Sequence, residues 1–144
     1  MKEYVVVMLF TKDCKEVLLV KRKKKPYEGM YNGIGGKLEK GETPIECAIR
    51  ESSEETKIHL NNPKLLVTYV YPENSSINPG TVLNVIYDFV DKVDVEENYE
   101  GTYEWKEISF VMDPFDKNIA GHSNLNQFIK EIFEVENLKK YYEW

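Results

Sequence analysis

Apolar runs separated by turn residues predict most of the secondary structure of this chain. Runs rich in Val, Ile, Leu, Tyr and Phe are typical of β-strands. On this basis, strands are expected at Tyr4–Phe10, Glu16–Arg22, Lys64–Tyr71, Thr81–Val90 and Tyr103–Val111. A glycine-rich segment, Glu28–Gly41, carries no such run and is expected to be a loop.

Two segments carry the signals of helices instead. In the first, Thr43 is placed as an N-cap, Pro44 stands at the first helical position, and Glu46 follows three residues after the cap. Together these residues form a strong start signal for an α-helix. Nearer the C-terminus, apolar residues recur at helical spacing, namely Leu125, Phe128, Ile129, Ile132 and Phe133. The order of strands, helix, strands and helix predicts an α/β (α+β) fold in which helices cover a mixed sheet.

Length and charge limit the classes of protein to be considered. With 144 residues, the chain is most simply one domain over residues 1–144, which is a typical domain size. Its net charge of −6 argues against broad binding to nucleic acids, because phosphate backbones attract basic proteins. We therefore expect a small-molecule partner and no stable nucleic-acid partner. The sequence leaves open whether the protein is a monomer or a homodimer.

Membrane and cysteine signals point to an ordinary intracellular protein. The apolar run at the N-terminus is too short to span a membrane and has no small-residue cleavage site. Cys14 and Cys47 lie far apart and show no metal-type or redox-type spacing, so we expect two reduced thiols. These features predict a cytoplasmic location without a membrane partner.

A cluster of glutamates on the first predicted helix calls for an explanation. Glu51, Glu54 and Glu55 lie on one side of that helix, and such a face is most often simply solvated. However, like charges four residues apart, as at Glu51 and Glu55, destabilise a helix by a few tenths of a kcal/mol. The preceding glycines also allow backbone carbonyls to approach a ligand closely. Carboxylate and carbonyl oxygens are the ligands of hard cations such as Mg²⁺, so we expect a phosphate-chemistry site here.

This segment resembles the signature of the Nudix hydrolase family. That signature is a glycine, five residues, Glu, seven residues, and then Arg-Glu-apolar-x-Glu-Glu-x-Gly-apolar. The matching residues are Gly36, Glu42, Arg50, Glu51, Glu54, Glu55 and Ile58. Two positions depart from it, since Ser52 replaces an apolar residue and Lys57 replaces the glycine. Ser52 is expected on the buried side, where its hydroxyl must bond a local carbonyl or cost stability. Lys57 would end the helix without the usual left-handed glycine.

The resemblance implies a Nudix-type α/β/α sandwich that hydrolyses nucleoside diphosphates linked to another group. It also implies a bound Mg²⁺, for which Mn²⁺ can substitute. The implied metal ligands are the backbone carbonyl of Gly35 and the side chains of Glu51, Glu54 and Glu55. Arg50 and Glu42 would hold those glutamates in place through charge-assisted hydrogen bonds. Glu54 is the first candidate for the general base.

Outside the signature, the sequence is most similar to the MutT-type branch, whose members remove oxidised purine nucleoside triphosphates. That similarity implies substrate contacts from the residues Arg22, Lys23, Asn32, Lys37 and Asn124. It also implies a further carboxylate from Glu104 to the metal or the catalytic water, which makes Glu104 the second acid/base candidate after Glu54. Each residue also has an ordinary interpretation. The basic run Lys21–Lys25 can be a solvated patch, the Asn-Gly pair a turn, Glu104 an exposed loop residue, and Asn124 a helix cap.

The leading functional hypothesis is a pyrophosphohydrolase that converts 8-oxo-dGTP to the monophosphate and pyrophosphate. A second hypothesis keeps the chemistry and changes the substrate to ADP-ribose, a nucleotide sugar, a dinucleotide or capped RNA. A third, from a different class, is a non-catalytic nucleotide sensor with a Nudix fold. Such sensors typically lose a signature glutamate, and none is missing here.

Overall fold

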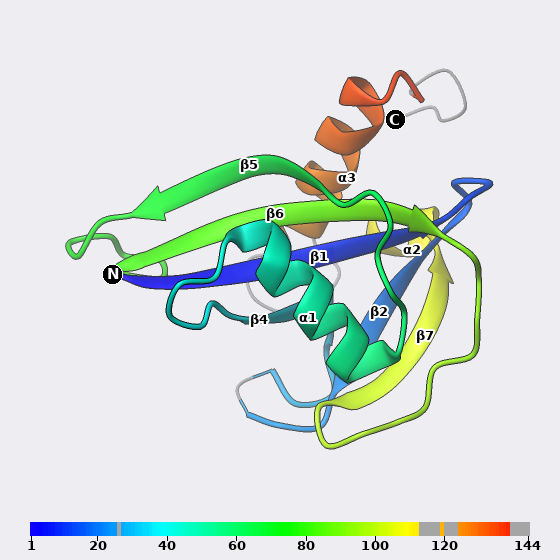
Figure 1. Ribbon diagram of the computed structural model, residues 1–144, viewed down its shortest axis with the longest axis horizontal. Helices are drawn as coiled ribbons and strands as arrows, with labels where there is room; N and C mark the ends of the chain where they lie inside the picture. Colours follow the sequence, from blue (N-terminus) through cyan, green and yellow to red (C-terminus); the bar gives the residue numbers. More distant parts are fainter. Residues whose placement is uncertain (26, 113–118, 120–123, 139–144) are drawn as a thin grey trace.

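A mixed β-sheet lies between helices in the computed structural model (Figure 1), which describes residues 1–25, 27–112, 119 and 124–138. The elements are β1 (Lys2–Thr11), β2 (Glu16–Arg22), β3 (Tyr31–Asn32), β4 (Ile34–Lys37), α1 (Pro44–Thr56), β5 (Lys64–Tyr71), β6 (Thr81–Val90), β7 (Gly101–Glu107), α2 (Ile108–Val111) and α3 (Leu125–Val135). Among these residues, no helix combines the length and the apolar character needed to cross a bilayer.

Strand β1 is the centre of the sheet. It pairs in parallel with β6 along its whole length, and the strand order is β3-β2-β1-β6-β5. The other edge of β1 is divided, because β4 pairs antiparallel with Tyr4–Val7 while β2 meets Phe10. Strand β7 pairs antiparallel with β2. One parallel pairing among antiparallel ones confirms the expected mixed sheet.

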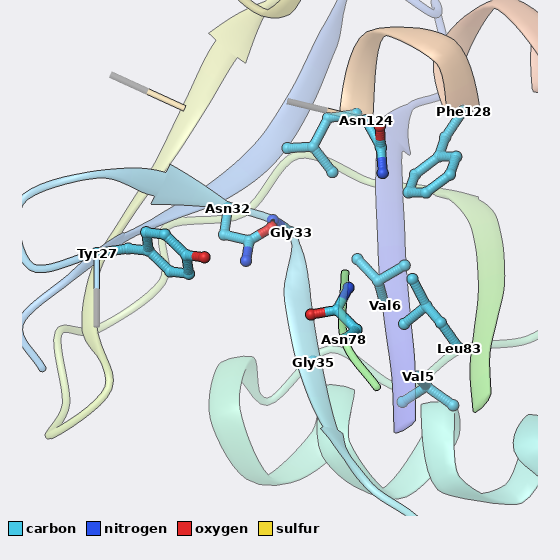
Figure 2. Close-up of a pocket in the computed structure, with 11 residues that line it drawn as sticks. Val5, Val6, Tyr27, Asn32, Gly33, Gly35, Asn78, Leu83, Asn124 and Phe128 are labelled. Carbon is cyan, nitrogen blue, oxygen red and sulfur yellow. Dashed lines mark hydrogen bonds between the residues drawn. The ribbon is translucent and has the colours of Figure 1, made fainter. Parts of the chain in front are cut away.

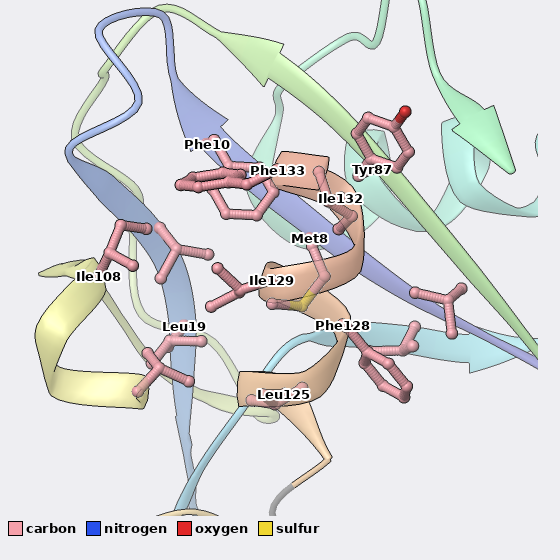
Figure 3. Packing of buried hydrophobic residues seen from close by; sticks show 14 of the residues in the cluster. Met8, Phe10, Leu19, Tyr87, Ile108, Leu125, Phe128, Ile129, Ile132 and Phe133 are labelled. Carbon is pink, nitrogen blue, oxygen red and sulfur yellow. The ribbon is translucent and has the colours of Figure 1, made fainter. Parts of the chain in front are cut away.

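Both faces of β1 are buried, which explains why its sequence reads as one continuous apolar run. Successive side chains of a strand point to opposite faces. Val5, Val7 and Leu9 belong to the cluster that includes Cys47 and Ala48 of α1. The alternate residues Met8 and Phe10 pack instead against Ile129, Ile132 and Phe133 of α3 (Figure 3). Helix α1 therefore covers one face of the sheet and α3 covers the other.

Two sequence-based boundaries were wrong. The strand expected over Tyr103–Val111 ends at Glu107, and Ile108–Val111 forms the short helix α2. Ile108 and Val111, three residues apart, are both buried, and this spacing suits one helical turn rather than a strand. The segment expected as a loop, Glu28–Gly41, contains the short strands β3 and β4, which are held by pairing with β2 and β1 rather than by their own apolar pattern.

The start of α1 confirms the predicted signal. The Thr43 side chain accepts a hydrogen bond from the backbone N–H of Glu46, and the Glu46 side chain accepts one from the N–H of Thr43. At the other end, Lys57 adopts a left-handed conformation with φ of 65° and donates its N–H to the Ser53 carbonyl. Lysine thus makes the turn that glycine usually makes at this position.

Ser52 also behaves as its position requires. The residue is fully buried, and its hydroxyl donates to the backbone carbonyl of Ile58 over 2.8 Å. A buried hydroxyl with a partner avoids the cost of an unpaired polar group. This bond ties the last turn of α1 to the chain that follows it.

Candidate active site

Arg50 connects the acidic residues of the signature. Its Nε and Nη2 donate to the two carboxylate oxygens of Glu42 over 2.7 and 2.9 Å. Its Nη1 donates to Glu51 over 2.9 Å and to Glu54 over 3.2 Å, while Nη2 also reaches the Lys37 carbonyl at 3.2 Å. The hydrogen bonds from Arg50 lower the pKa of Glu42 to about 2. Glu42 therefore stays ionised and fixes the guanidinium plane.

Glu55 lies in a different environment from its neighbours. Its Oε1 accepts a hydrogen bond from the Tyr103 hydroxyl over 3.0 Å, whereas its Oε2 is buried and has no partner in the described part of the chain. Burial, assisted by the charge of Glu51, raises the pKa of Glu55 to about 8. A buried carboxylate oxygen without a donor is costly, so this atom is suited to a cation.

Tyr103 and Asn98 position Glu55 and were not predicted from the sequence. The Asn98 side-chain amide donates to the Glu55 backbone carbonyl over 3.0 Å and also contacts the Tyr103 hydroxyl. Tyr103 is buried, and this burial raises the pKa of its hydroxyl, which therefore stays a donor. No local motif links Tyr103 to Glu55, which lie 48 positions apart.

Two consecutive glycines of β4 complete this side of the site. Gly36 lies against the Glu51 side chain, and a Cβ placed there would overlap the carboxylate. Gly35 points to the other face of the sheet, opposite Val6 of β1, and lines a pocket. The glycine of the signature is thus required by a close approach to Glu51.

The chemistry of these residues fits a divalent metal ion. Glu51, Glu54 and Glu55 lie within about one and a half turns of α1. The Oε2 of Glu55 has no partner among the described residues. In the described residues, no group of three acidic, His or Cys side chains is already arranged to hold a metal ion. Glu51 and Glu54 instead share the Nη1 of Arg50. The predicted ligand set of Gly35, Glu51, Glu54 and Glu55 stays a prediction that this donor set supports.

A pocket of about 230 Å³ lies on the α3 side of the sheet, next to β4 (Figure 2). It brings together Asn32, Asn124 and Gly35, all of which the sequence indicated as site residues. It also includes two residues that the sequence analysis missed, Tyr27 and Asn78. The other described lining residues are Val5, Val6, Gly33, Leu83, Leu125 and Phe128, so no charged side chain among the described residues lines the pocket.

The side chains of Asn124 and Asn32 are not fully used by the helix cap and the turn that would ordinarily explain these residues. Asn124 is the N-cap residue of α3 by position, but its side chain makes no capping hydrogen bond. The Oδ1 of Asn32 accepts the Gly33 N–H over 2.8 Å, which leaves the Nδ2 donors of Asn32 for the pocket. Both side chains are therefore able to bind a ligand there (Figure 2).

The predicted basic contacts lie outside this pocket. Arg22 ends β2 opposite Gly101, and the Lys23 ammonium forms an ion pair with Glu97. The Lys37 side chain is exposed on β4. Phosphate contacts from Arg22, Lys23 and Lys37 stay predictions, and Lys23 would have to leave Glu97 to make one.

Glu104 lies on the face of the sheet opposite to Tyr103. It pairs with Leu19, accepts a hydrogen bond from the Tyr31 hydroxyl over 2.8 Å and contacts the Lys106 ammonium at 3.3 Å. Because neighbours on a strand alternate, Glu104 faces the α3 side whereas Tyr103, which holds Glu55, faces the α1 side. The structure does not bring Glu104 to Glu55, and a role for Glu104 beside a metal stays a prediction.

Comparisons with known proteins agree with this geometry. The sequence model of the NUDIX domain family matches residues 1–133. The chain is 30% identical over 92 residues to a protein of Bacillus subtilis named uncharacterized Nudix hydrolase YvcI, which covers 62% of this chain and 58% of that protein. It is 35% identical over 72 residues to the ADP-ribose pyrophosphatase of Methanocaldococcus jannaschii, which covers 50% of this chain and 41% of that protein. The chain thus spans less than two thirds of the length of either relative.

The fold is also similar to that of a solved structure. The NUDIX domain of Shewanella oneidensis NrtR, complexed with ADP ribose, superimposes with a TM-score of 0.72 at 18% identity and covers 93% of this chain and 87% of that chain. At this identity the likeness shows the fold. Together with the family match over residues 1–133, it leads to one conclusion: the chain belongs to the NUDIX domain family.

Proposed function

We propose that this chain is a metal-dependent pyrophosphohydrolase that cleaves the diphosphate linkage of a nucleoside diphosphate derivative. The observation that carries the proposal is the buried Oε2 of Glu55, which has no partner in the described residues. Glu55 lies on the same helix as Glu51 and Glu54. Family membership supports the same chemistry. The alternative of a purely solvated acidic face does not explain a glutamate whose Oε2 is buried.

Each residue has a separate task in this proposal. Glu51, Glu54 and Glu55 would hold the metal ion, which neutralises phosphate charge and makes water a better nucleophile. Arg50 holds Glu51 and Glu54, and Tyr103 fixes the orientation of Glu55. Glu54 is the proposed proton acceptor, because its side chain is 60% exposed whereas that of Glu51 is 15% exposed. A carboxylate open to solvent is able to receive a proton from the attacking water.

The proposed substrate is a purine nucleoside triphosphate, with 8-oxo-dGTP first and the monophosphate and pyrophosphate as products. Asn32 and Asn124 share one pocket whose described lining residues are uncharged, and amide groups match the donor and acceptor edge of a purine. Gly35 lines the same pocket and lies beside Gly36, which contacts Glu51. A base in the pocket would therefore direct its phosphates past β4 toward α1.

ADP-ribose is the second candidate substrate. It is favoured by the 35% identity to the ADP-ribose pyrophosphatase of Methanocaldococcus jannaschii. The pocket suits an adenine as well as a guanine, because amides both donate and accept hydrogen bonds. The two candidates differ in their products, so one experiment separates them.

Incubation with Mg²⁺ and a panel of 8-oxo-dGTP, dGTP, dATP and ADP-ribose tests the proposed function. We expect pyrophosphate and 8-oxo-dGMP from the first substrate, with turnover lost when EDTA removes the metal ion. Release of AMP and ribose phosphate from ADP-ribose alone would assign the second candidate. If none of the four is turned over but nucleotides still bind, the protein is a sensor and the proposed function is wrong.

Asn32→Ala tests the assignment of the base pocket. Losing the Nδ2 donor is expected to raise KM for the preferred purine triphosphate about five- to tenfold, while kcat at saturation stays within about twofold. Steady-state kinetics measure both constants. Asn61→Ala, at an exposed asparagine outside this pocket, serves as the control. An unchanged KM in Asn32→Ala would remove Asn32 from the base contact.

A further inference from the structure

A loop remote from the signature contributes an amide to the same pocket. Asn78 lies in the β5–β6 connection, residues 72–80, and lines the pocket together with Asn32 and Asn124 (Figure 2). Three asparagines from separate parts of the chain therefore surround one opening. No signature residue and no spacing in the sequence indicates Asn78.

The backbone at Asn78 is held in an uncommon conformation. Its φ is 46°, in the left-handed region, and Tyr27 on the other loop of the pocket also has a positive φ of 69°. Left-handed residues other than glycine carry strain and are concentrated at functional sites. Asparagine tolerates this region better than most residues, so the conformation alone does not separate a structural role from a functional one.

Hydrogen bonds fix the loop and leave the Asn78 side chain unengaged. The Thr81 hydroxyl donates to the Asn78 backbone carbonyl over 2.6 Å. The Gly80 N–H bonds the Pro72 carbonyl at 3.2 Å, and the Gly80 carbonyl accepts the Lys2 N–H at 3.2 Å. In the described part of the chain, by contrast, no hydrogen bond involves the side-chain amide of Asn78. Asn78 is exposed, so the loop presents a fixed backbone and an amide whose donors and acceptor are open to water or to a ligand.

The surroundings of this amide define what it can bind. The pocket of about 230 Å³ is smaller than the roughly 300–1,000 Å³ of sites that enclose a whole drug-sized ligand, so a nucleotide placed here would have its base inside and its phosphates outside. None of the side chains that line it within the described part of the chain is charged. Asn78 also lines the open concavity formed by residues such as Tyr4 and Thr81, which places it at the mouth of the pocket.

We propose that Asn78 is a specificity-determining residue whose amide hydrogen-bonds the polar edge of an uncharged nucleobase from the side of the β5–β6 loop. This inference rests on the proposed function and extends it. It assigns base selection to the β5–β6 loop, which lies outside the signature segment. Substrates with a neutral base that carries both donors and acceptors fit this arrangement, and the lining residues that the structure describes offer no counter-charge for an ionised group.

Glycine substitution separates the side chain of Asn78 from its backbone. Asn78→Gly keeps the left-handed turn without strain and removes only the amide, so the fold is retained. We expect Asn78→Gly to change the dGTP-to-dATP ratio of kcat/KM about five- to tenfold, with kcat at saturation within about twofold of the parent. Asn74→Gly is the matched control, because Asn74 is exposed in the same loop and does not line the pocket.

A second pair of substrates distinguishes the base from the sugar. The GTP-to-dGTP ratio is expected to be the same in the parent, Asn78→Gly and Asn74→Gly. A shift of this ratio in Asn78→Gly with an unchanged dGTP-to-dATP ratio would overturn the base assignment. If Asn78→Gly kept both parental ratios, the role of Asn78 would be confined to the turn and the proposal would be wrong. Failure of the parent protein to hydrolyse any nucleotide would instead reject the proposed function.

Discussion

Glu55→Gln is expected to lower metal-dependent turnover about a thousandfold or more, and at the same time to stabilise the metal-free protein above neutral pH. Glutamine cannot supply the anionic oxygen that a divalent ion requires. In the absence of metal, however, the Oε2 of Glu55 is buried and has no partner among the described residues, and an amide there avoids the cost of a buried charge. Steady-state kinetics with Mg²⁺ and thermal unfolding in EDTA measure the two effects.

The raised pKa of Glu55 determines how the stability of the metal-free protein changes with pH. Burial raises the pKa of Glu55 from the ordinary 4.5 to about 8, so the folded protein keeps a proton that the unfolded chain releases. Between pH 4.5 and 8 the folded state binds more protons, and the free energy of unfolding of the metal-free protein therefore falls as pH rises. We expect Glu55→Gln to remove this fall, and Mg²⁺ to reduce it by supplying the counter-charge.

Urea unfolding in EDTA between pH 5 and 8.5 tests the pH effect. Glu96→Gln, an exposed carboxylate in the β6–β7 connection, should keep the slope of the parent protein. If the parent and Glu55→Gln lose stability equally over this range, Glu55 has the same protonation state in the folded and the unfolded protein, and burial does not raise its pKa.

Gly36→Ala is expected to abolish most activity while leaving the fold almost unchanged. A Cβ at Gly36 overlaps the Glu51 carboxylate, and a flexible side-chain end moves aside at little cost. The stability loss should therefore stay within about 1 kcal/mol, whereas the displaced carboxylate no longer supports the metal ion. We expect kcat/KM to fall at least about a hundredfold, measured beside unfolding in urea.

A double-mutant cycle supplies the control for Gly36→Ala. In a Glu51→Gln background the carboxylate is already lost, so adding Gly36→Ala should cause little further fall in kcat/KM. Additive losses would show instead that the methyl group acts through the β4 backbone rather than through Glu51. That result would contradict the proposed reason for glycine at this position.

The parts of the site that local sequence determines were predictable. Thr43, Pro44 and Glu46 fix the start of α1, and the 3.6-residue period then places the three glutamates on one side. The two departures from the signature also follow from local interactions, because the buried Ser52 hydroxyl donates to the Ile58 carbonyl and Lys57 adopts the left-handed turn. Signals of this kind depend on residues a few positions apart, which a single sequence displays.

Tertiary contacts were beyond the reach of the sequence. Tyr103 reaches Glu55 only because β7 pairs with β2 and turns this residue toward α1. Asn78 enters the pocket through a long loop with no motif of its own. Strands β3 and β4 are too short to show the alternation of apolar and polar residues that predicts a strand. Helix α2 directly follows β7, and its apolar residues extend the pattern that predicted a strand there. Each of these depends on which segments pack together.

The adjacent glycines of β4 have a mechanical consequence. Gly35 borders the pocket on one side of the sheet, and Gly36 abuts Glu51 on the other. The peptide unit between Gly35 and Gly36 therefore connects the pocket proposed for the base with the acidic helix α1. Any sliding of β4 along β1 would displace the pocket wall and the Glu51 contact together. A misplaced base would therefore shift the position of the reacting phosphates relative to α1, and no moving lid is needed for this coupling.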